Sequence, residues 1–211
     1  DREQVEMLNR VAEHNRWTSK RYYAVDFTSM ESTNAFIEEI GTYPRIDVCV
    51  NNAGINRINF VDETSLNDWR DILAVNLDAP FLITRAVSKL MKRNQYGRII
   101  NISSIFGVIT KAKRCIYSTA KHGLRGLTMT SAVDLAPYNI LVNSVSPGFV
   151  FTDLTKRILS KTDIAELEAQ VPMKRFALPD EVSRVVLFLA SDLNTYITGQ
   201  NIVVDGGYTN V

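Results

Sequence analysis

The chain has 211 residues, of which 45% are hydrophobic and 22% are charged, and its formal net charge is +1. These values predict one globular domain spanning residues 1–211 and argue against electrostatic binding of nucleic acid or an anionic membrane. No apolar stretch is long enough to span a bilayer, and no secretory-type start is present, so a cytoplasmic protein is expected. The two cysteines and two histidines lack metal-ligand spacing, so we expect no metal.

Hydrophobic periodicity predicts helices and strands that alternate along the chain. The predicted strands are Arg21–Phe27, Asp47–Val50, Arg98–Ser103, Asn139–Val145 and Asn201–Val204. The predicted helices are 2–15, 32–40, one opened by a capping box at Ser65–Asp68, one through 81–91, 116–136, two within 152–170, and 180–191. The strands are continuously apolar, which is typical of a parallel sheet covered on both faces. The pattern predicts a doubly wound α/β fold, in which ligands bind beyond the carboxyl ends of the strands.

Tyr117 and Lys121 are candidates for acid–base chemistry. They are four residues apart on a predicted helix, so their side chains lie on one face. A solvated pair on a helix surface is the simpler interpretation. The functional interpretation is that the lysine cation lowers the pKa of the phenol, which lets the tyrosine exchange a proton with an alcohol or alkoxide near neutral pH.

Polar or small residues follow several predicted strands, and each has a structural alternative. Ser103 and Ser104 either form a turn or bind a ligand at the strand end. Asn51-Asn52-Ala53-Gly54 is either a turn or a place where backbone approaches a flat ligand. Asp26 either accepts a hydrogen bond from an adenine amino group or caps the next helix through Thr28-Ser29.

Three further positions are ambiguous in the same way. Asn76 is either a polar break in a helix or a site that orders a water. Pro147-Gly148 is a stop signal by default. Thr152 is either a helix N-cap or the holder of a carboxamide.

Together these residues resemble the short-chain dehydrogenase/reductase family. The matching stretches are Asn51-Asn52-Ala53-Gly54, Asn76, Ser104, Tyr117 with Lys121, Pro147-Gly148 with Thr152, Ile197-Thr198-Gly199-Gln200 and Val204-Asp205-Gly206-Gly207. The resemblance covers essentially the whole chain. It implies a Rossmann-type three-layer domain and an NAD(P)-dependent oxidoreductase that moves a hydride between nicotinamide and a carbonyl or alcohol.

The resemblance also implies roles for individual residues. Tyr117 would be the general acid/base, Lys121 would lower its pKa and hold the nicotinamide ribose, and Ser104 would bind the substrate oxygen. Asn76 would hold a water in a proton relay behind Lys121. The implied cofactor contacts are Asp26, Phe27, Asn52, Ala53, Gly54, Tyr117, Lys121, Pro147, Gly148, Val150 and Thr152.

The chain departs from the family's pattern because no GxxxGxG phosphate loop occurs in it. In the family's strand order 3-2-1-4-5-6-7, that loop follows the first strand, and a second strand precedes the helix predicted at 2–15. Without these two strands, about 10–15 Å would separate Arg21–Phe27 from Asp47–Val50, and the former would lose its pairing. We therefore expect a strand–helix–strand segment ahead of residue 1, without which pyrophosphate binding would be lost or crippled.

The resemblance leaves the substrate class open. Residues 147–178 are most similar to 3-oxoacyl-[acyl-carrier-protein] reductases, which implies a carrier-bound substrate and fatty acid biosynthesis. Lys156 stands where such reductases have a basic residue for the acidic carrier, whereas Gln95 occupies the other such position. Lys121-His122-Gly123 resembles hydroxyacid and sugar dehydrogenases instead. A non-catalytic fragment or subunit is the alternative of another class.

Cofactor choice and assembly are also predicted. Arg2 favours NADP over NAD, because a cation suits a 2′-phosphate. The helices at 77–94 and 117–136 resemble the family's paired-helix interface, and small residues on the second allow close packing. A homotetramer or homodimer is therefore expected.

Overall fold

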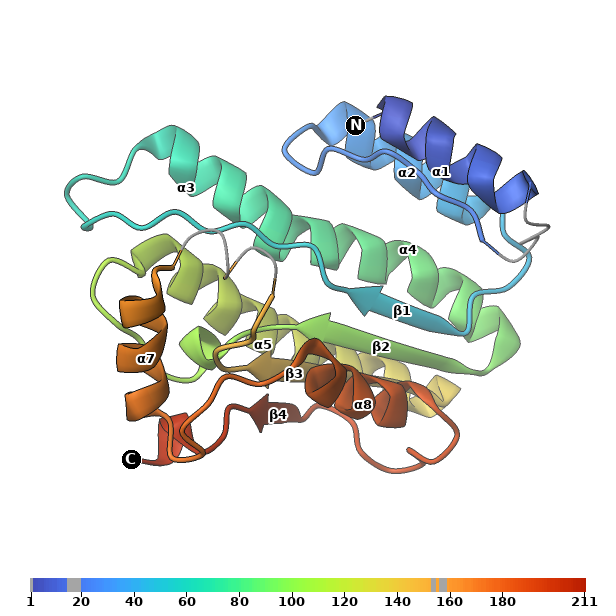
Figure 1. Cartoon of the computed structure of the whole chain (residues 1–211). Helices are drawn as coiled ribbons and strands as arrows, with labels where there is room; N and C mark the ends of the chain where they lie inside the picture. The colour runs from blue at the N-terminus through green and yellow to red at the C-terminus, as the bar shows by residue number, and fades with distance from the viewer. Residues whose placement is uncertain (1, 15–19, 153–154, 156–158) are drawn as a thin grey trace.

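The computed structural model describes residues 2–14, 20–152, 155 and 159–211 (Figure 1). One sheet of parallel strands runs in the order β1 (Val48–Asn51), β2 (Gly97–Ile102), β3 (Ile140–Pro147) and β4 (Asn201–Val204). The α-helices are α1 (Arg2–His14), α2 (Met30–Gly41), α3 (Leu66–Leu73), α4 (Ala79–Asn94), α5 (Cys115–Leu135), α7 (Lys161–Gln170) and α8 (Pro179–Ala190). The shorter elements are the π-helical turn η1 (Ala74–Asp78) and the 3-10 helices η2 (Ile105–Gly107), η3 (Ala136–Tyr138) and η4 (Tyr208–Asn210).

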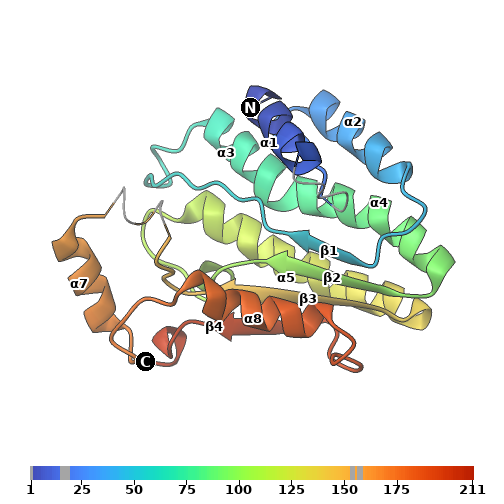
Figure 2. The same ribbon diagram turned by 45° about the vertical axis from the view of Figure 1, so that its right-hand side comes forward.

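Helices cover both faces of the sheet. Successive strand residues point to opposite faces, so each face has its own buried cluster. In β2, Ile99 packs in a buried cluster with Leu90 of α4 and Leu135 of α5. The next residue, Ile100, packs with Leu189 of α8 on the other face. Figure 1 accordingly shows α8 in front of the sheet and α5 behind it, and Figure 2 shows the same layers from another side. The predicted three-layer parallel α/β fold is confirmed.

Local sequence signals begin the helices where the patterns predict. The Ser65 hydroxyl accepts the N–H of Asp68 at 3.0 Å and so caps α3. Of the two short helices predicted within residues 152–170, α7 is present. Part of that range, including Lys156, lies outside the described residues.

The strand predicted at Arg21–Phe27 is wrong. Residues 20–26 have no ladder partner, and β1 is the edge of the sheet on that side. Side chains hold the segment instead: the Asn9 carboxamide exchanges two hydrogen bonds of 2.9 Å with the Tyr22 backbone, and the Tyr23 hydroxyl donates to a glutamate of α2. A β-type run forms a strand only where a neighbouring strand completes its hydrogen bonds, so the expected loss of pairing is observed.

Gly107 gives a test of how tightly β2 is joined to α5. A Cβ at this position would lie 2.7 Å from Ser103 Oγ and 2.9 Å from the Lys121 backbone oxygen. We expect Gly107→Ala to lower the free energy of unfolding by about 1–3 kcal/mol, measured by urea denaturation. Gly41→Ala is the control, because a Cβ there meets nothing within 4 Å, and it should be neutral or mildly stabilising. Equal stabilities for the two variants would contradict this packing.

Candidate active site

The side chains predicted to carry the chemistry lie beyond the carboxyl end of β2. Ser104 follows this strand, and Tyr117 and Lys121 lie near the start of α5. The helix η2 connects the two parts: the Ser104 hydroxyl accepts the N–H of Phe106 at 3.2 Å, and the Phe106 and Tyr117 rings meet edge to face with centroids 6.4 Å apart. The path β2–η2–α5 therefore brings Ser104 and Tyr117 together.

Lys121 is a buried cation in this site. It is 3% exposed, and its Nζ donates to the Ile102 backbone oxygen at 2.8 Å. Burial lowers the pKa of Lys121 to about 8, because the charged form loses its hydration. An ammonium carries three donors, and within the described chain this is its single hydrogen bond. Donor capacity is thus left for a ligand.

Burial and two neighbouring groups shift the pKa of Tyr117. Burial raises the pKa of Tyr117, while a hydrogen bond with Ser104 and the positive charge of Arg114 act in the opposite direction. Lys121 was predicted to lower this pKa, and its Nζ lies 5.6 Å from the centre of the Tyr117 ring. With a pKa of about 8, Lys121 stays mainly protonated near neutral pH, and its predicted effect on Tyr117 stays a prediction.

Asn76 fixes the loop that follows β1. It is 0% exposed, its Nδ2 donates to the Ile55 backbone oxygen at 2.7 Å, and its Oδ1 accepts the Ile55 N–H at 2.9 Å. A Cβ on Gly54 would lie 3.1 Å from Asn76 Oδ1 and 3.7 Å from Lys121 Nζ. The structure therefore brings Gly54, Asn76 and Lys121 together.

The polar break predicted at Asn76 is a π-helical turn, η1, between two α-helices. Such turns are frequent at functional sites, because the extra residue re-aims a side chain. The role of the Ile55 backbone was missed, since no sequence signal marks a backbone partner. The predicted water at Asn76 stays a prediction.

A cleft of about 640 Å³ extends from this loop towards the amino-terminal part of the chain. The residues that line it include Arg2, Asp26, Phe27, Ile55 and Val75. It adjoins the loop that Asn76 fixes and includes Asp26 and Phe27, where the resemblance implies the adenosine part of a dinucleotide.

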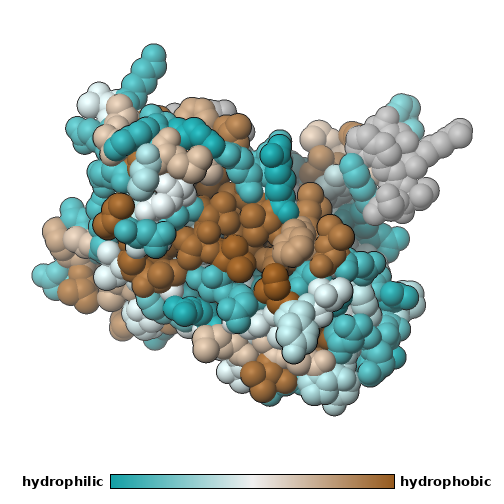
Figure 3. Space-filling model, turned by 90° about the horizontal axis from the view of Figure 1, so that it is seen from below, coloured by the Kyte–Doolittle hydropathy of each residue, from teal (hydrophilic) through white to brown (hydrophobic). Residues whose placement is uncertain are grey.

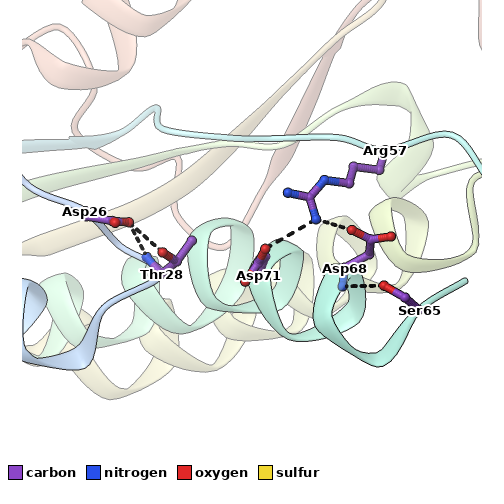
Figure 4. Close-up of polar contacts among 6 residues, drawn as sticks. All are labelled: Asp26, Thr28, Arg57, Ser65, Asp68 and Asp71. Carbon is purple, nitrogen blue, oxygen red and sulfur yellow. Dashed lines mark hydrogen bonds and ion pairs between the residues drawn. The ribbon is translucent and has the colours of Figure 1, made fainter. Parts of the chain in front are cut away.

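Asp26 has a structural partner at this cleft, as Figure 4 shows. One carboxylate oxygen accepts the Thr28 N–H at 2.9 Å and the Thr28 hydroxyl at 2.7 Å. These bonds lower the pKa of Asp26. The cap of α2 is Ser29, whose hydroxyl accepts the N–H of Ser32. The predicted capping stretch is therefore correct, but Asp26 orders the turn before it.

Asn52 and Ala53 line a narrower cavity of about 260 Å³ on the outer side of β1. Phe27 and Val75 line both this cavity and the larger cleft, so the two adjoin. None of the proposed catalytic side chains lines the narrower cavity. The contact of Asn52 and Ala53 with an adenosine ribose stays a prediction.

Pro147 is the last residue of β3, and Gly148, Val150 and Thr152 follow the strand. Gly148 donates its N–H to a β4 carbonyl at 2.9 Å, which extends the sheet by one residue. The Thr152 hydroxyl accepts the N–H of Thr155 at 3.2 Å, which is the capping geometry of the simpler interpretation. Contact between these residues and a nicotinamide carboxamide stays a prediction.

Arg57 holds the loop after β1 against α3. Its guanidinium pairs with Asp68 and with Asp71, the latter at 3.3 Å (Figure 4). The sequence patterns did not identify Arg57, because ion pairs between a loop and a helix leave no periodic signal. The pair is half-exposed, so its contribution is positional more than energetic.

The described residues fit two parts of a nicotinamide dinucleotide. Lys121 offers unused donors beside Tyr117, and Gly54 leaves space that a Cβ would occupy. The cleft at Asp26 suits the adenosine part. The fit concerns these two parts alone, since the sequence printed here contains no GxxxGxG turn for a pyrophosphate.

A family model described as "Enoyl-(Acyl carrier protein) reductase" matches residues 1–209. The chain belongs to the short-chain dehydrogenase/reductase family. It is therefore an NAD(P)-dependent oxidoreductase of carbonyl or alcohol groups, as the resemblance implies.

Relatives of this chain act on different substrates. It is 45% identical over 184 residues to a 3-oxoacyl-[acyl-carrier-protein] reductase of Aquifex aeolicus. The aligned region covers 87% of this chain and 74% of the relative. It is 42% identical over 189 residues to trans-4-hydroxycyclohexanecarboxylate dehydrogenase of Sinomonas cyclohexanicum, with coverages of 88% and 69%. It matches a crystal structure of gluconate 5-dehydrogenase from Burkholderia cenocepacia in complex with NADP and tartrate, with a TM-score of 0.86, 30% identity and coverages of 95% and 80%.

The described residues contain neither a membrane-spanning helix nor a cluster of metal ligands. None of their helices is both long and apolar enough to cross a bilayer. They also contain no group of three or more His, Cys, Asp or Glu side chains that could hold a metal ion.

The burial of Lys121 gives a testable pH dependence. Its folded-state pKa of about 8 lies below its ordinary value of 10.5, so the unfolded chain binds more protons between these values and stability rises with pH there. Lys121→Met removes this term. The wild type should therefore gain about 2–3 kcal/mol of stability relative to Lys121→Met between pH 7 and pH 10, measured by urea denaturation.

Lys161→Met serves as the control for that measurement, because Lys161 is exposed at the start of α7. Its stability difference from the wild type should stay constant over the same pH range. A constant difference for Lys121→Met as well would show that the lysine is not held as a buried cation.

Proposed function

We propose that Tyr117 exchanges the proton while a hydride moves between NAD(P) and a carbonyl or alcohol of the substrate. The observation that carries this proposal is the meeting of Tyr117, Ser104 and the buried Lys121 beyond the end of β2. The bound nicotinamide supplies or accepts the hydride. Ser104 holds the substrate oxygen, and Tyr117 protonates it in reduction or deprotonates it in oxidation.

Lys121 and Asn76 act by positioning in this proposal. Lys121 uses the donors that Ile102 leaves free to bind the nicotinamide ribose hydroxyls. Asn76 holds the Ile55 backbone and with it the loop at Gly54, beside the Lys121 ammonium. Orientation of this kind contributes much of the rate of a hydride-transfer enzyme.

NADP is the favoured cofactor. Arg2 lines the same cleft as Asp26, and its exposed guanidinium suits a 2′-phosphate on the adenosine ribose. The gluconate 5-dehydrogenase structure that resembles this chain contains NADP, which supports the proposal.

The substrate has two candidate classes. Similarity to the Aquifex reductase supports a carrier-bound 3-oxoacyl thioester and a place in fatty acid biosynthesis. The hydroxycyclohexanecarboxylate and gluconate dehydrogenases support a small hydroxy acid instead. A cytoplasmic location is part of the proposal in both cases.

A homodimer or homotetramer is proposed through α4 and α5. Val133 and Met129 of α5 are 76% and 51% exposed, and Phe81 of α4 is 46% exposed. Figure 3 shows that another face, seen from below, also gathers hydrophobic side chains in a band between polar areas. Exposed apolar surface of this kind is typical of faces that become buried between subunits.

Tyr117→Phe tests the catalytic proposal. Removing the hydroxyl removes the proton donor, so kcat should fall by about 10²–10⁴-fold in an assay of nicotinamide absorbance. Tyr196→Phe is the control, because Tyr196 is 95% exposed, and it should retain wild-type activity. Undiminished activity of Tyr117→Phe would contradict the role given to Tyr117, whereas no activity in either protein would favour the non-catalytic alternative.

The same assay compares NADPH with NADH. Arg2→Ala should weaken the preference for NADPH, because the cation that meets the 2′-phosphate is lost. An initial preference for NADH would contradict the role given to Arg2.

Val133→Arg tests the proposed assembly. A charge on the exposed face of α5 should shift the mass measured by light scattering towards the monomer. Val61→Arg, at a 71% exposed position in the loop before α3, should leave the mass unchanged. A wild-type protein that is monomeric at every concentration would exclude the interface.

A further inference from the structure

Arg114 lies beside the proposed catalytic tyrosine. It precedes the first residue of α5, and its backbone oxygen accepts the N–H of Ser118 at 2.8 Å, so the first helical turn fixes its position. Tyr117 is three residues further along, which places both side chains on neighbouring parts of the helix surface.

Phe106 links the two side chains. The Arg114 guanidinium carbon lies 5.3 Å from the centre of the Phe106 ring, within the range of a cation–π contact. The Phe106 and Tyr117 rings also meet edge to face, with their centroids 6.4 Å apart. Phe106 is itself buried, at 8% exposure, so it gives Arg114 a fixed apolar support.

The charge of Arg114 has no counter-charge among the described residues. Its side chain is half-buried, and burial lowers its pKa, with Tyr117 as the group that acts against this shift. Within the described residues, the Arg114 guanidinium contacts the Phe106 ring but makes no hydrogen bond or ion pair with its five donors. Water supplies acceptors to this half-exposed guanidinium, so its donors are available to a ligand that carries an acceptor.

Three other described arginines have acceptors within the chain. Arg57 pairs with two aspartates, and Arg175 forms a double hydrogen bond with Glu181. Arg98, 4% exposed, donates to three backbone carbonyls. Arg114 therefore differs from them in lacking an internal partner.

We propose that Arg114 binds the free carboxylate of a short oxo-acid or hydroxy-acid substrate whose carbonyl or alcohol lies at Tyr117. This inference rests on the proposed oxidoreductase function and assigns its substrate class. A planar guanidinium matches a carboxylate with two parallel hydrogen bonds. The Phe106 ring holds the guanidinium in place, so little side-chain entropy is lost on binding.

The spacing favours a carboxylate on the substrate itself over the phosphate of a carrier arm. One helical turn separates Arg114 from Tyr117, which suits an acid group only a few bonds from the reacting carbon. In a carrier-bound thioester, the anionic phosphate is separated from the reacting carbonyl by the length of the arm. The carbonyl next to the thioester sulfur is uncharged.

The first test compares acetoacetate with its methyl ester, which differ in charge but share a carbon skeleton. With the wild type and NADPH, kcat/KM should favour acetoacetate by at least about ten-fold. Arg114→Gln should lower kcat/KM for acetoacetate by about 10–100-fold and leave that for the ester within about three-fold. Arg114→Lys should restore part of the difference, since it keeps the charge but loses the paired geometry.

Lys111→Met is the matched control for loss of a nearby surface cation. Lys111 is exposed in the same loop before α5, so this variant should keep the wild-type preference. Equal loss in Lys111→Met and Arg114→Gln would show general electrostatic attraction in place of a specific site.

The second test does not depend on turnover. Phenylglyoxal modifies accessible arginines, and peptide mass spectrometry measures the rate at each position. Acetoacetate should slow modification of Arg114 several-fold, whereas the methyl ester should not, and exposed Arg125 of α5 should react at the same rate in all samples.

The outcomes separate this inference from the proposed function. If Tyr117-dependent turnover is found but the acid and the ester react equally well, Arg114 does not bind a carboxylate and the substrate assignment is overturned. If neither compound is turned over, protection of Arg114 by acetoacetate still supports the binding site, and its absence overturns the inference. Loss of Tyr117-dependent turnover with every substrate would instead reject the proposed function.

Discussion

The burial of the Lys121 ammonium is the constraint on which the rest of the site depends. A charged group that is 3% exposed needs a fixed acceptor, and the Ile102 backbone oxygen supplies one at 2.8 Å. That oxygen belongs to the last residue of β2, so the hydrogen bond holds α5 against the end of the strand. The position of Tyr117, one helical turn earlier on α5, follows from the same contact.

Close approach of backbone to this lysine requires small residues around it. Gly107 lies where a side chain would overlap Ser103 and the Lys121 backbone, and Gly54 lies where one would crowd Asn76. The strand, the short helix η2 and the loop after β1 therefore converge on one side chain. Buried donors are normally hydrogen-bonded, so the unused donors of Lys121 are consistent with the proposed contact to the nicotinamide ribose.

The sequence predicted the core of the fold well, because its strands and helices carry strong, continuous signals. The strand at Asn201–Val204 agrees residue for residue, and the strands at the centre of the sheet shift by only one or two residues. Arg21–Phe27 was predicted as a strand from composition alone, and composition does not reveal whether a neighbouring strand is present. Pairing is a long-range property, and this segment has its hydrogen bonds with α1 and α2 instead.

The site was predicted as a set of residues but not as a set of interactions. Helical spacing was enough to place Tyr117 beside Lys121, and strand ends were enough to place Ser104 near them. The effect of burial on the pKa values of Tyr117 and Lys121 was not predicted, since no sequence pattern reports the burial of a helix face against a loop. The Asn76–Ile55 clamp was also hidden, because any residue type supplies the backbone groups that Asn76 binds.

Two arginines at opposite ends of the strands differ in their hydrogen-bond partners. Arg98, near the amino end of β2, is buried and donates to the carbonyls of Gly97, Asn139 and Asn194, so the chain itself satisfies most of its donors. Arg114, on the side of the carboxyl ends, is partly desolvated and has no such acceptor among the described residues. Three backbone carbonyls hold Arg98 in place, although its buried Nε has no partner, whereas the half-exposed Arg114 keeps its donors open to solvent beside Tyr117, as the proposed carboxylate site requires. In this parallel sheet, the edge at the amino ends of the strands is structural, and the proposed binding site lies at the edge formed by their carboxyl ends.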